Sequence, residues 1–145
     1  MRIARFAVGT DVAFGVVDGA DVAALVAHPF GDLVFTDARW PLADVRLLAP
    51  ILPSKIVAVG RNYAEHAREM GAEPRDPVLF LKPSTAVIGP GEPIRRPAGI
   101  GRVDFEGELA VVIGRLARDV PPSRAAEVVL GYTCANDVTA RDQQQ

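Results

Sequence analysis

Apolar and polar residues alternate along many short segments of this chain, and this pattern predicts a structure built mainly of β-strands. Alternation with a period of two places successive side chains on opposite faces of a strand. From this alternation and from short apolar runs we predict strands at residues 2–8, 12–17, 33–35, 45–48, 55–60, 78–82, 103–114 and 132–135, with brief strands at 86–88 and near Ile94. Asp18 and Gly19 give a tight-turn signal after the second of these strands.

Short helices are expected between the strands. Residues 64–70 contain good helix formers and stop at Gly71. Residues 124–130 follow Ser123, a preferred N-cap residue, and residues 22–27 read equally well as a helix or a strand. Because strands dominate and no long strand–helix alternation is present, the predicted fold class is α+β, mostly β, and not a Rossmann sheet.

Prolines bracket residues 50–54 and mark the predicted domain boundary. Residues 1–49 are expected to form a small β-rich N-terminal domain. Titratable groups do not cluster in it, so we interpret it as structural. Residues 50–145 carry the reactive residue types and are expected to form the second domain.

Composition narrows the function classes. The 145 residues are 49% hydrophobic and 23% charged, with a formal net charge of −2 and scattered basic residues. This balance predicts a globular protein and argues against nucleic-acid and anionic-lipid partners. No apolar run approaches the ~20 residues that span a bilayer. A single cysteine, Cys134, suits a reducing cytoplasm, and its apolar neighbours predict that it fills the core.

Glu106 and Glu108 lie near the start of the apolar segment at residues 103–114. In a strand they share one face, with Cα atoms roughly 6.5 Å apart. Ala110 and Val112 continue that face, which predicts a sheltered wall rather than a solvated surface. Two like charges there need a compensating cation, and a divalent metal is the economical candidate. The alternative interpretation is a solvated strand edge.

Two further groups carry reactive residue types. If a helix follows Asp137, that residue shares a face with Arg141 and Gln144, although Asp137 or Thr139 could instead cap the helix. His66 and Glu69 lie one turn apart on the helix predicted at residues 64–70, an arrangement that suits a general base. A surface histidine beside a salt-bridged glutamate has the same spacing. An all-carboxylate set of Glu106, Glu108 and Asp137 favours Mg²⁺, Mn²⁺ or Ca²⁺.

Four ordered motifs, taken together, resemble the fumarylacetoacetate hydrolase family, in its branch of acylpyruvate hydrolases, oxaloacetate decarboxylases and 2-hydroxyhepta-2,4-diene-1,7-dioate isomerases. The motifs are I-L-P-S-K-I-V-A-V-G-R-N-Y-A-E-H-A-R-E-M-G, V-L-F-L-K-P-S-T-A, V-D-F-E-G-E-L-A-V-V-I-G and G-Y-T-C-A-N-D-V-T-A-R-D-Q-Q. They cover the chain from about Ala49 onward. The resemblance implies a mixed β-sheet roll or sandwich with short helices, preceded by a small N-terminal domain.

The resemblance also implies roles for individual residues. The family's metal ligands fall on Glu106, Glu108 and Asp137, with Mg²⁺ or Mn²⁺ as the usual ion. Its catalytic histidine and partner glutamate fall on His66 and Glu69. The substrate-binding residues would be Arg141, Gln144 and Lys82, although a lysine that snorkels from an apolar strand would read the same.

The implied activity is that of a divalent-metal-dependent enzyme acting on small 2-oxo or β-dicarbonyl acids through a metal-bound enolate. Hydrolysis of a C–C bond, decarboxylation and keto–enol isomerisation share that enolate, so the sequence does not separate them. The family's catalytic domain runs beyond Gln145, so residues 50–145 are expected to be its N-terminal part, and relatives are commonly homodimers. The alternative function is a non-catalytic, or truncated and inactive, domain that binds dicarboxylates or metal.

Overall fold

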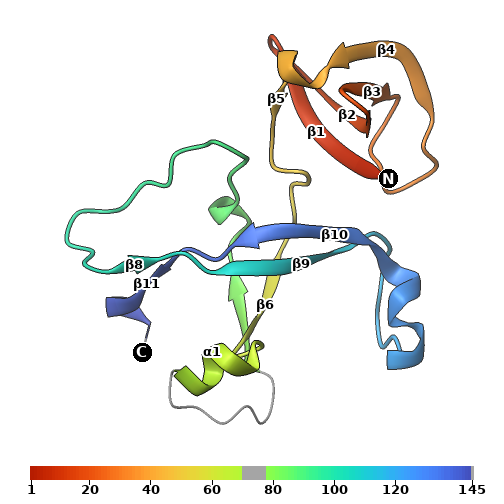
Figure 1. Cartoon of the computed structure of the whole chain (residues 1–145). Helices are drawn as coiled ribbons and strands as arrows, with labels where there is room; N and C mark the ends of the chain where they lie inside the picture. The colour runs from red at the N-terminus through yellow and green to blue at the C-terminus, as the bar shows by residue number, and fades with distance from the viewer. Residues whose placement is uncertain (70–77, 145) are drawn as a thin grey trace. The chain divides into compact units, whose positions relative to one another are not determined.

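The chain folds into small antiparallel sheets joined by short helices, as a computed structural model shows (Figure 1). The structure describes residues 1–69 and 78–144. Strands account for 44% and helices for 14% of the chain, which confirms the α+β, mostly β class. The chain divides into two compact units, Met1–Ala27 with Leu33–Glu92 and His28–Asp32 with Pro93–Gln145.

The first unit contains a five-stranded antiparallel sheet with the strand order β4-β3-β2-β1-β5. Two-residue loops connect β1 to β2 and β2 to β3. Gly9 and Gly19 take the first position of these loops with φ of 59° and 60°. Glycine adopts this positive φ at no steric cost, as a type II′ hairpin turn requires. The strands are β1 (Arg2–Val8), β2 (Asp11–Asp18), β3 (Asp21–Leu25), β4 (Phe35–Pro41) and β5 (Arg46–Leu47).

The hydrophobic core of this sheet is centred on Phe6, Val22 and Ala24. Phe6 and Val22 are fully buried. The Phe6 ring meets the edge of Trp40 with a centroid distance of 5.7 Å. Gly15 leaves the space for this packing, because a Cβ atom there would lie 2.6 Å from the carbonyl oxygen of Ala23 and 2.9 Å from the Phe6 ring.

The described residues in the rest of the first unit form one strand pair and one α-helix. Strand β6 (Ile56–Gly60) pairs antiparallel with β7 (Val78–Lys82), and α1 (Ala64–Glu69) follows β6. Short 3₁₀ helices lie at Leu42–Asp44 and Ser84–Ala86.

The second unit is built on two antiparallel strand pairs. Strand β9 (Gly107–Ile113) pairs with β10 (Val129–Asn136) in the longer pair, which Figure 1 shows side by side. Strand β8 (Val103–Asp104) pairs with β11 (Thr139–Ala140) in the shorter one. Further 3₁₀ helices lie at Pro122–Val128 and Arg141–Gln143.

Several sequence predictions about local structure are wrong. No α-helix follows Asp137 in the described residues, because Thr139 and Ala140 instead pair with β8 as a strand and only the short 3₁₀ helix at Arg141–Gln143 comes after them. Residues 122–128 form a 3₁₀ helix in which Pro121 and not Ser123 takes the N-cap place. Residues 22–25, which the sequence left open between helix and strand, are strand, whereas β4 extends well past the segment predicted at 33–35.

Other differences are smaller. Residues 87–94 form no strand, and the 3₁₀ turn at Ser84–Ala86 replaces the start of the strand predicted at 86–88. The strand predicted over residues 103–114 is interrupted at Phe105 and Glu106. Cys134 is exposed rather than part of a core. Among the described residues no helix has the length and apolar character needed to cross a membrane.

Candidate functional site

Glu106 lies in the break between β8 and β9, where hydrogen bonds to both its backbone N–H and its carbonyl oxygen hold it in place. The backbone N–H of Glu106 donates a hydrogen bond of 3.0 Å to the Asn136 side-chain oxygen. The carbonyl oxygen of Glu106 accepts a hydrogen bond of 2.8 Å from the backbone N–H of Asp137. Two residues that are adjacent in sequence therefore fix Glu106 where the regular ladder stops, and they bring the backbones of Glu106 and Asp137 together.

Strand alternation continues through this break. Asp104, Glu106 and Glu108 are partly buried, whereas Val103, Phe105 and Gly107 are exposed. Further along β9, Ala110 and Val112 are also partly buried, and the residues between them are exposed. The prediction that Glu106 and Glu108 occupy alternate positions on the more sheltered side of the strand is confirmed.

Arg141 contacts three side chains through its three guanidinium nitrogens. Its Nε lies 2.9 Å from Asp104 Oδ2. One terminal nitrogen lies 2.5 Å from Glu106 Oε1, and the other lies 2.6 Å from Gln144 Oε1. The predicted pair of Arg141 and Gln144 therefore does meet, through a 3₁₀ turn and not through a helix face.

A second arginine, Arg102, also binds Asp104. Arg102 donates to both of its carboxylate oxygens, at 2.9 Å and 2.8 Å. Hydrogen bonds from Arg102 and then Arg141 lower the pKa of Asp104 to about 2. The hydrogen bond to Asp104, ahead of the one to Glu106, raises the pKa of Arg141 above its ordinary value. Asp104 is thus charged at neutral pH and lies between two arginines.

The three carboxylates predicted as metal ligands fit a hard divalent cation by residue type and by backbone placement. Glu106 and Asp137 are joined by a backbone hydrogen bond, and Glu108 follows Glu106 at the next alternate position. In the described residues no three His, Cys, Asp or Glu side chains are gathered closely enough to hold an ion. The Glu106 carboxylate is turned to Arg141 instead, so binding an ion there requires a rotation of this side chain.

The remaining predicted site residues lie in the first compact unit. His66 and Glu69 fall within α1, but their side chains lie outside the described part of the chain. Lys82 is the partly buried last residue of β7, a strand that is otherwise exposed. Each unit is described by itself, so the meeting of these three residues with Glu106 stays a prediction.

Sequence reasoning missed Asp104 and Asn136. A signal for Asp104 was present, because it precedes Glu106 by two residues and so continues the same alternation in D-x-E-x-E. Asn136 had no comparable signal, since its contact depends on the pairing of β9 with β10. Residue spacing alone does not specify that pairing.

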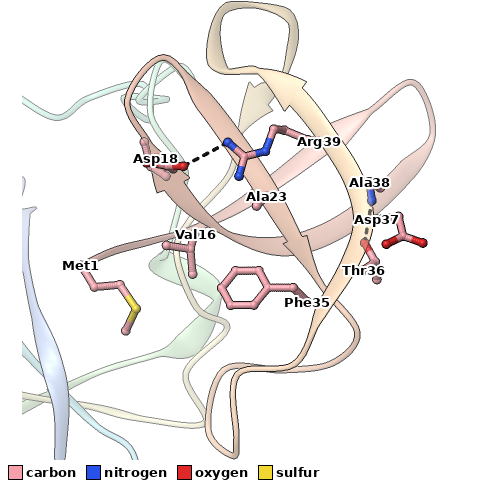
Figure 2. A pocket seen from close by; sticks show the side chains of 10 residues that line it. Met1, Val16, Asp18, Ala23, Phe35, Thr36, Asp37, Ala38 and Arg39 are labelled. Atoms are coloured by element: carbon pink, nitrogen blue, oxygen red, sulfur yellow. Dashed lines mark hydrogen bonds and ion pairs between the residues drawn. The ribbon is translucent and has the colours of Figure 1, made fainter.

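A hollow of about 460 Å³ lies on the five-stranded sheet. Figure 2 shows Phe35 and Val16 beside it and Arg39 extending to Asp18, with which it forms an ion pair of 3.0 Å. None of the predicted site residues lines this hollow.

Comparisons with known protein families match both parts of the sequence. Residues 55–145 match the family described as fumarylacetoacetate (FAA) hydrolase C-terminal, and residues 1–50 match the one described as Rv2993c-like, N-terminal. The chain belongs to the fumarylacetoacetate hydrolase family. The resemblance of the four motifs is thereby confirmed, whereas the domain boundary at residues 50–54 stays a prediction.

Among curated relatives, Protein Rv2993c of Mycobacterium tuberculosis is 58% identical over 153 residues, covering 100% of this chain and 58% of the relative. The mitochondrial oxaloacetate tautomerase FAHD1 of Arabidopsis thaliana is 50% identical over 92 residues, covering 63% of this chain and 41% of the relative. The chain thus spans 58% of the length of the first relative and less than half of the second.

Solved structures of family members share the fold. The 5-carboxymethyl-2-hydroxymuconate delta-isomerase from Mycobacterium smegmatis is 56% identical with a TM-score of 0.89, over 99% of this chain and 57% of that one. The maleylpyruvate hydrolase from Sphingobium sp. SYK-6, in complex with manganese(II) ion and pyruvate, is 33% identical with a TM-score of 0.75, over 99% of this chain and 60% of that one. The fumarylacetoacetate hydrolase-like fold is therefore established.

Proposed function

We propose that this protein is a divalent-metal-dependent enzyme that acts on small 2-oxo or β-dicarbonyl acids. The observation that carries the proposal is the arrangement at the break between β8 and β9. Glu106 is fixed there beside Asp137 by a backbone hydrogen bond of 2.8 Å, with the Arg141 guanidinium against its carboxylate. Acidic ligands for a cation and a basic group for an anionic substrate thus adjoin one another.

Glu106, Glu108 and Asp137 would hold Mg²⁺ or Mn²⁺, and Ca²⁺ is a further candidate. Their carboxylate oxygens are the ligands that these hard cations prefer. A bound ion supplies Lewis-acid chemistry that stabilises the negative charge of an enolate. The manganese in the solved maleylpyruvate hydrolase supports this choice of metal.

Arg141 and Gln144 would bind the carboxylate of the substrate. A guanidinium group presents a planar pair of N–H donors that matches a carboxylate. Gln144 already contacts one terminal nitrogen of Arg141, so the two side chains can act on the same anion. We assign the general base to His66, with Glu69 as its partner, and place Lys82 at the substrate.

Keto–enol isomerisation is the first reaction to test. Relatives 50–56% identical over the aligned region are named as a tautomerase and an isomerase, whereas the hydrolase is 33% identical. Isomerisation needs only the transfer of a proton to and from a stabilised enolate, which a base such as His66 can perform. Hydrolysis of a C–C bond and decarboxylation also depend on a stabilised enolate, so both reactions remain part of the proposal.

The test uses the complete protein, stripped of metal and reloaded with Mn²⁺. Oxaloacetate, acylpyruvates, fumarylacetoacetate and hydroxymuconate-type diacids are assayed with and without the metal, and bound Mn²⁺ is followed separately by electron paramagnetic resonance. We expect metal-dependent turnover that falls about 100-fold or more in Glu106→Gln and Asp137→Asn. Glu127→Gln, which removes an exposed ion pair with Arg124, serves as the control.

Full activity in Glu106→Gln would refute the proposal. Binding of Mn²⁺ and dicarboxylates without turnover of any substrate would instead support the alternative, a non-catalytic binding domain. The neutralisation of Glu106 by Arg141 in this structure is the observation that keeps that alternative in view.

A further inference from the structure

The contacts of Arg141 divide into one at its stem and two at its outer edge. Asp104 takes the Nε atom, which is the nitrogen nearest the aliphatic chain, at 2.9 Å. Glu106 and Gln144 take the two terminal nitrogens. A carboxylate ligand binds most strongly to a pair of parallel N–H donors. Asp104 contacts only the Nε atom and does not occupy the edge of the guanidinium formed by the two terminal nitrogens.

The pair of Arg141 and Asp104 is also among the most sheltered ion pairs in the described residues. Their side chains are 17% and 23% exposed, and the neighbouring pair of Arg141 with Glu106 is comparable. By contrast, the ion pairs formed by Arg39, Arg46, Arg102, Arg118 and Arg124 each include a side chain that is 40% exposed or more. Exposed pairs are worth little, whereas a sheltered pair with good geometry restricts its side chains more strongly.

Backbone pairing fixes both ends of this contact. Asp104 lies opposite Thr139 in the β8–β11 ladder, and the backbone N–H of Arg141 donates 2.9 Å to the carbonyl oxygen of Arg102. Arg102 holds the same Asp104 carboxylate through two hydrogen bonds. The aspartate is therefore set in position by its strand and by a second arginine, independently of Glu106.

We propose that Asp104 is a positioning residue for the reaction, which holds Arg141 by its Nε so that the terminal nitrogens face the carboxylate of the substrate. This inference rests on the proposed function, in which Arg141 binds that carboxylate. Asp104 itself does not touch the substrate. Asp104 holds the long Arg141 side chain in one orientation before the substrate arrives. Less conformational entropy of that side chain is therefore lost when the substrate binds.

The hold on Arg141 is tested without activity. In ¹⁵N-edited NMR spectra of the complete protein, the Arg141 Nε–H group should give a resolved, slowly exchanging resonance. Asp104→Asn should broaden it or move it to the position of solvated arginines, and Glu127→Gln should leave it unchanged. An unaltered Arg141 resonance in Asp104→Asn would overturn the inference. Asp104→Glu, which keeps the charge, serves as a second variant if the asparagine variant does not fold, and it should keep the resonance protected.

The role in binding is tested by a double-mutant cycle with the substrate that the complete enzyme turns over. We expect Asp104→Asn to raise KM about 10-fold with kcat changed less than about 3-fold. Arg141→Gln should raise KM at least as much, and the double variant should be no worse than Arg141→Gln alone. Additive effects of the two substitutions, or a fall in kcat at constant KM, would show that Asp104 does not act through Arg141.

The two proposals fail in different ways. If the wild-type protein turns over no 2-oxo acid, the proposed function is wrong, and the NMR measurement still decides whether Asp104 holds Arg141. If turnover is found but Asp104→Asn matches wild type in KM, the proposed function stands and the positioning role is overturned.

Discussion

The five-stranded sheet and the strand pairs that carry the candidate site are stabilised in different ways. In the part of the chain that the structure describes, the buried hydrophobic residues lie between Ala4 and Ala49, and most belong to that sheet. Between residues 93 and 144, all of which the structure describes, no residue is buried. The first region thus closes around its own core, whereas the second depends on backbone ladders and ion pairs.

The second region also reverses the usual distribution of charged and apolar side chains. Leu109 is 63% and Tyr132 66% exposed, while Glu106 and Arg141 are each less than 20% exposed. Charged residues normally occupy the more exposed positions. The two regions thus differ in that charged side chains occupy much of the more sheltered side of the segment from β8 to β9, which they share with Ala110 and Val112. A site for ions and anions needs that arrangement, and a structural sheet does not.

The largest expected effect comes from the core of the first region. Phe6→Ala removes a fully buried ring that contacts Trp40, so it should lower the free energy of unfolding by about 3–5 kcal/mol. Chemical denaturation of the complete protein, followed by circular dichroism, measures this loss.

The matched variant in the second region is Val111→Ala, at a half-exposed position of β9. Because little apolar surface is withdrawn from water there, the loss should stay below about 1 kcal/mol. A loss as large as that of Phe6→Ala would contradict the comparison, since it would show that this face is packed in the complete protein.

A pair of glycine substitutions sharpens the same contrast. An added methyl group at Gly15 would collide with the Ala23 carbonyl and the Phe6 ring, so Gly15→Ala should destabilise by about 1–3 kcal/mol. At Gly107, on β9, nothing lies within 4 Å of the added atom, and Gly107→Ala should change stability by less than about 0.5 kcal/mol. Thermal unfolding of the two variants checks both values, and equal losses would show that crowding does not distinguish the two regions.

Hydrophobic alternation together with short apolar runs was sufficient to predict most of the strands. Residues 2–8 and 78–82 were predicted with the bounds that the structure has. A helix after Asp137, which was the condition for Asp137, Arg141 and Gln144 to share a face, does not form, because pairing with β8 gives that backbone its hydrogen bonds and overrides local propensity. For the same reason Leu130 belongs to β10 and not to the helix predicted at residues 124–130.

The candidate site was predictable only in part. Glu106 and Glu108 followed from alternation within one strand, and Arg141 with Gln144 from spacing, although the turn that joins them was misread. Asn136 and the contact between Asp104 and Arg141 depend on which strands pair. Pairing is a property of the whole sheet, so a single segment does not contain it.

The smallest effect concerns the charge network that takes the place of a core in the second region. The carboxyl ¹³C resonance of Asp104 should titrate with a midpoint of about 2, well below the ordinary value near 3.9. Since the pKa is lower in the folded state, the stabilisation from Asp104 is complete above about pH 4, and it is lost as the pH falls towards 2.

Two variants separate the contributions to this pKa. The hydrogen bond from Arg102 is the larger cause and that from Arg141 the smaller, so Arg102→Gln should raise the Asp104 midpoint more than Arg141→Gln does. Glu127→Gln, which alters a different carboxylate–arginine pair of the same unit, should leave it unchanged. A midpoint near 3.9 in the wild-type protein would mean that the arginines do not hold Asp104 in solution. The second region would then lack the charge network that distinguishes it from the first.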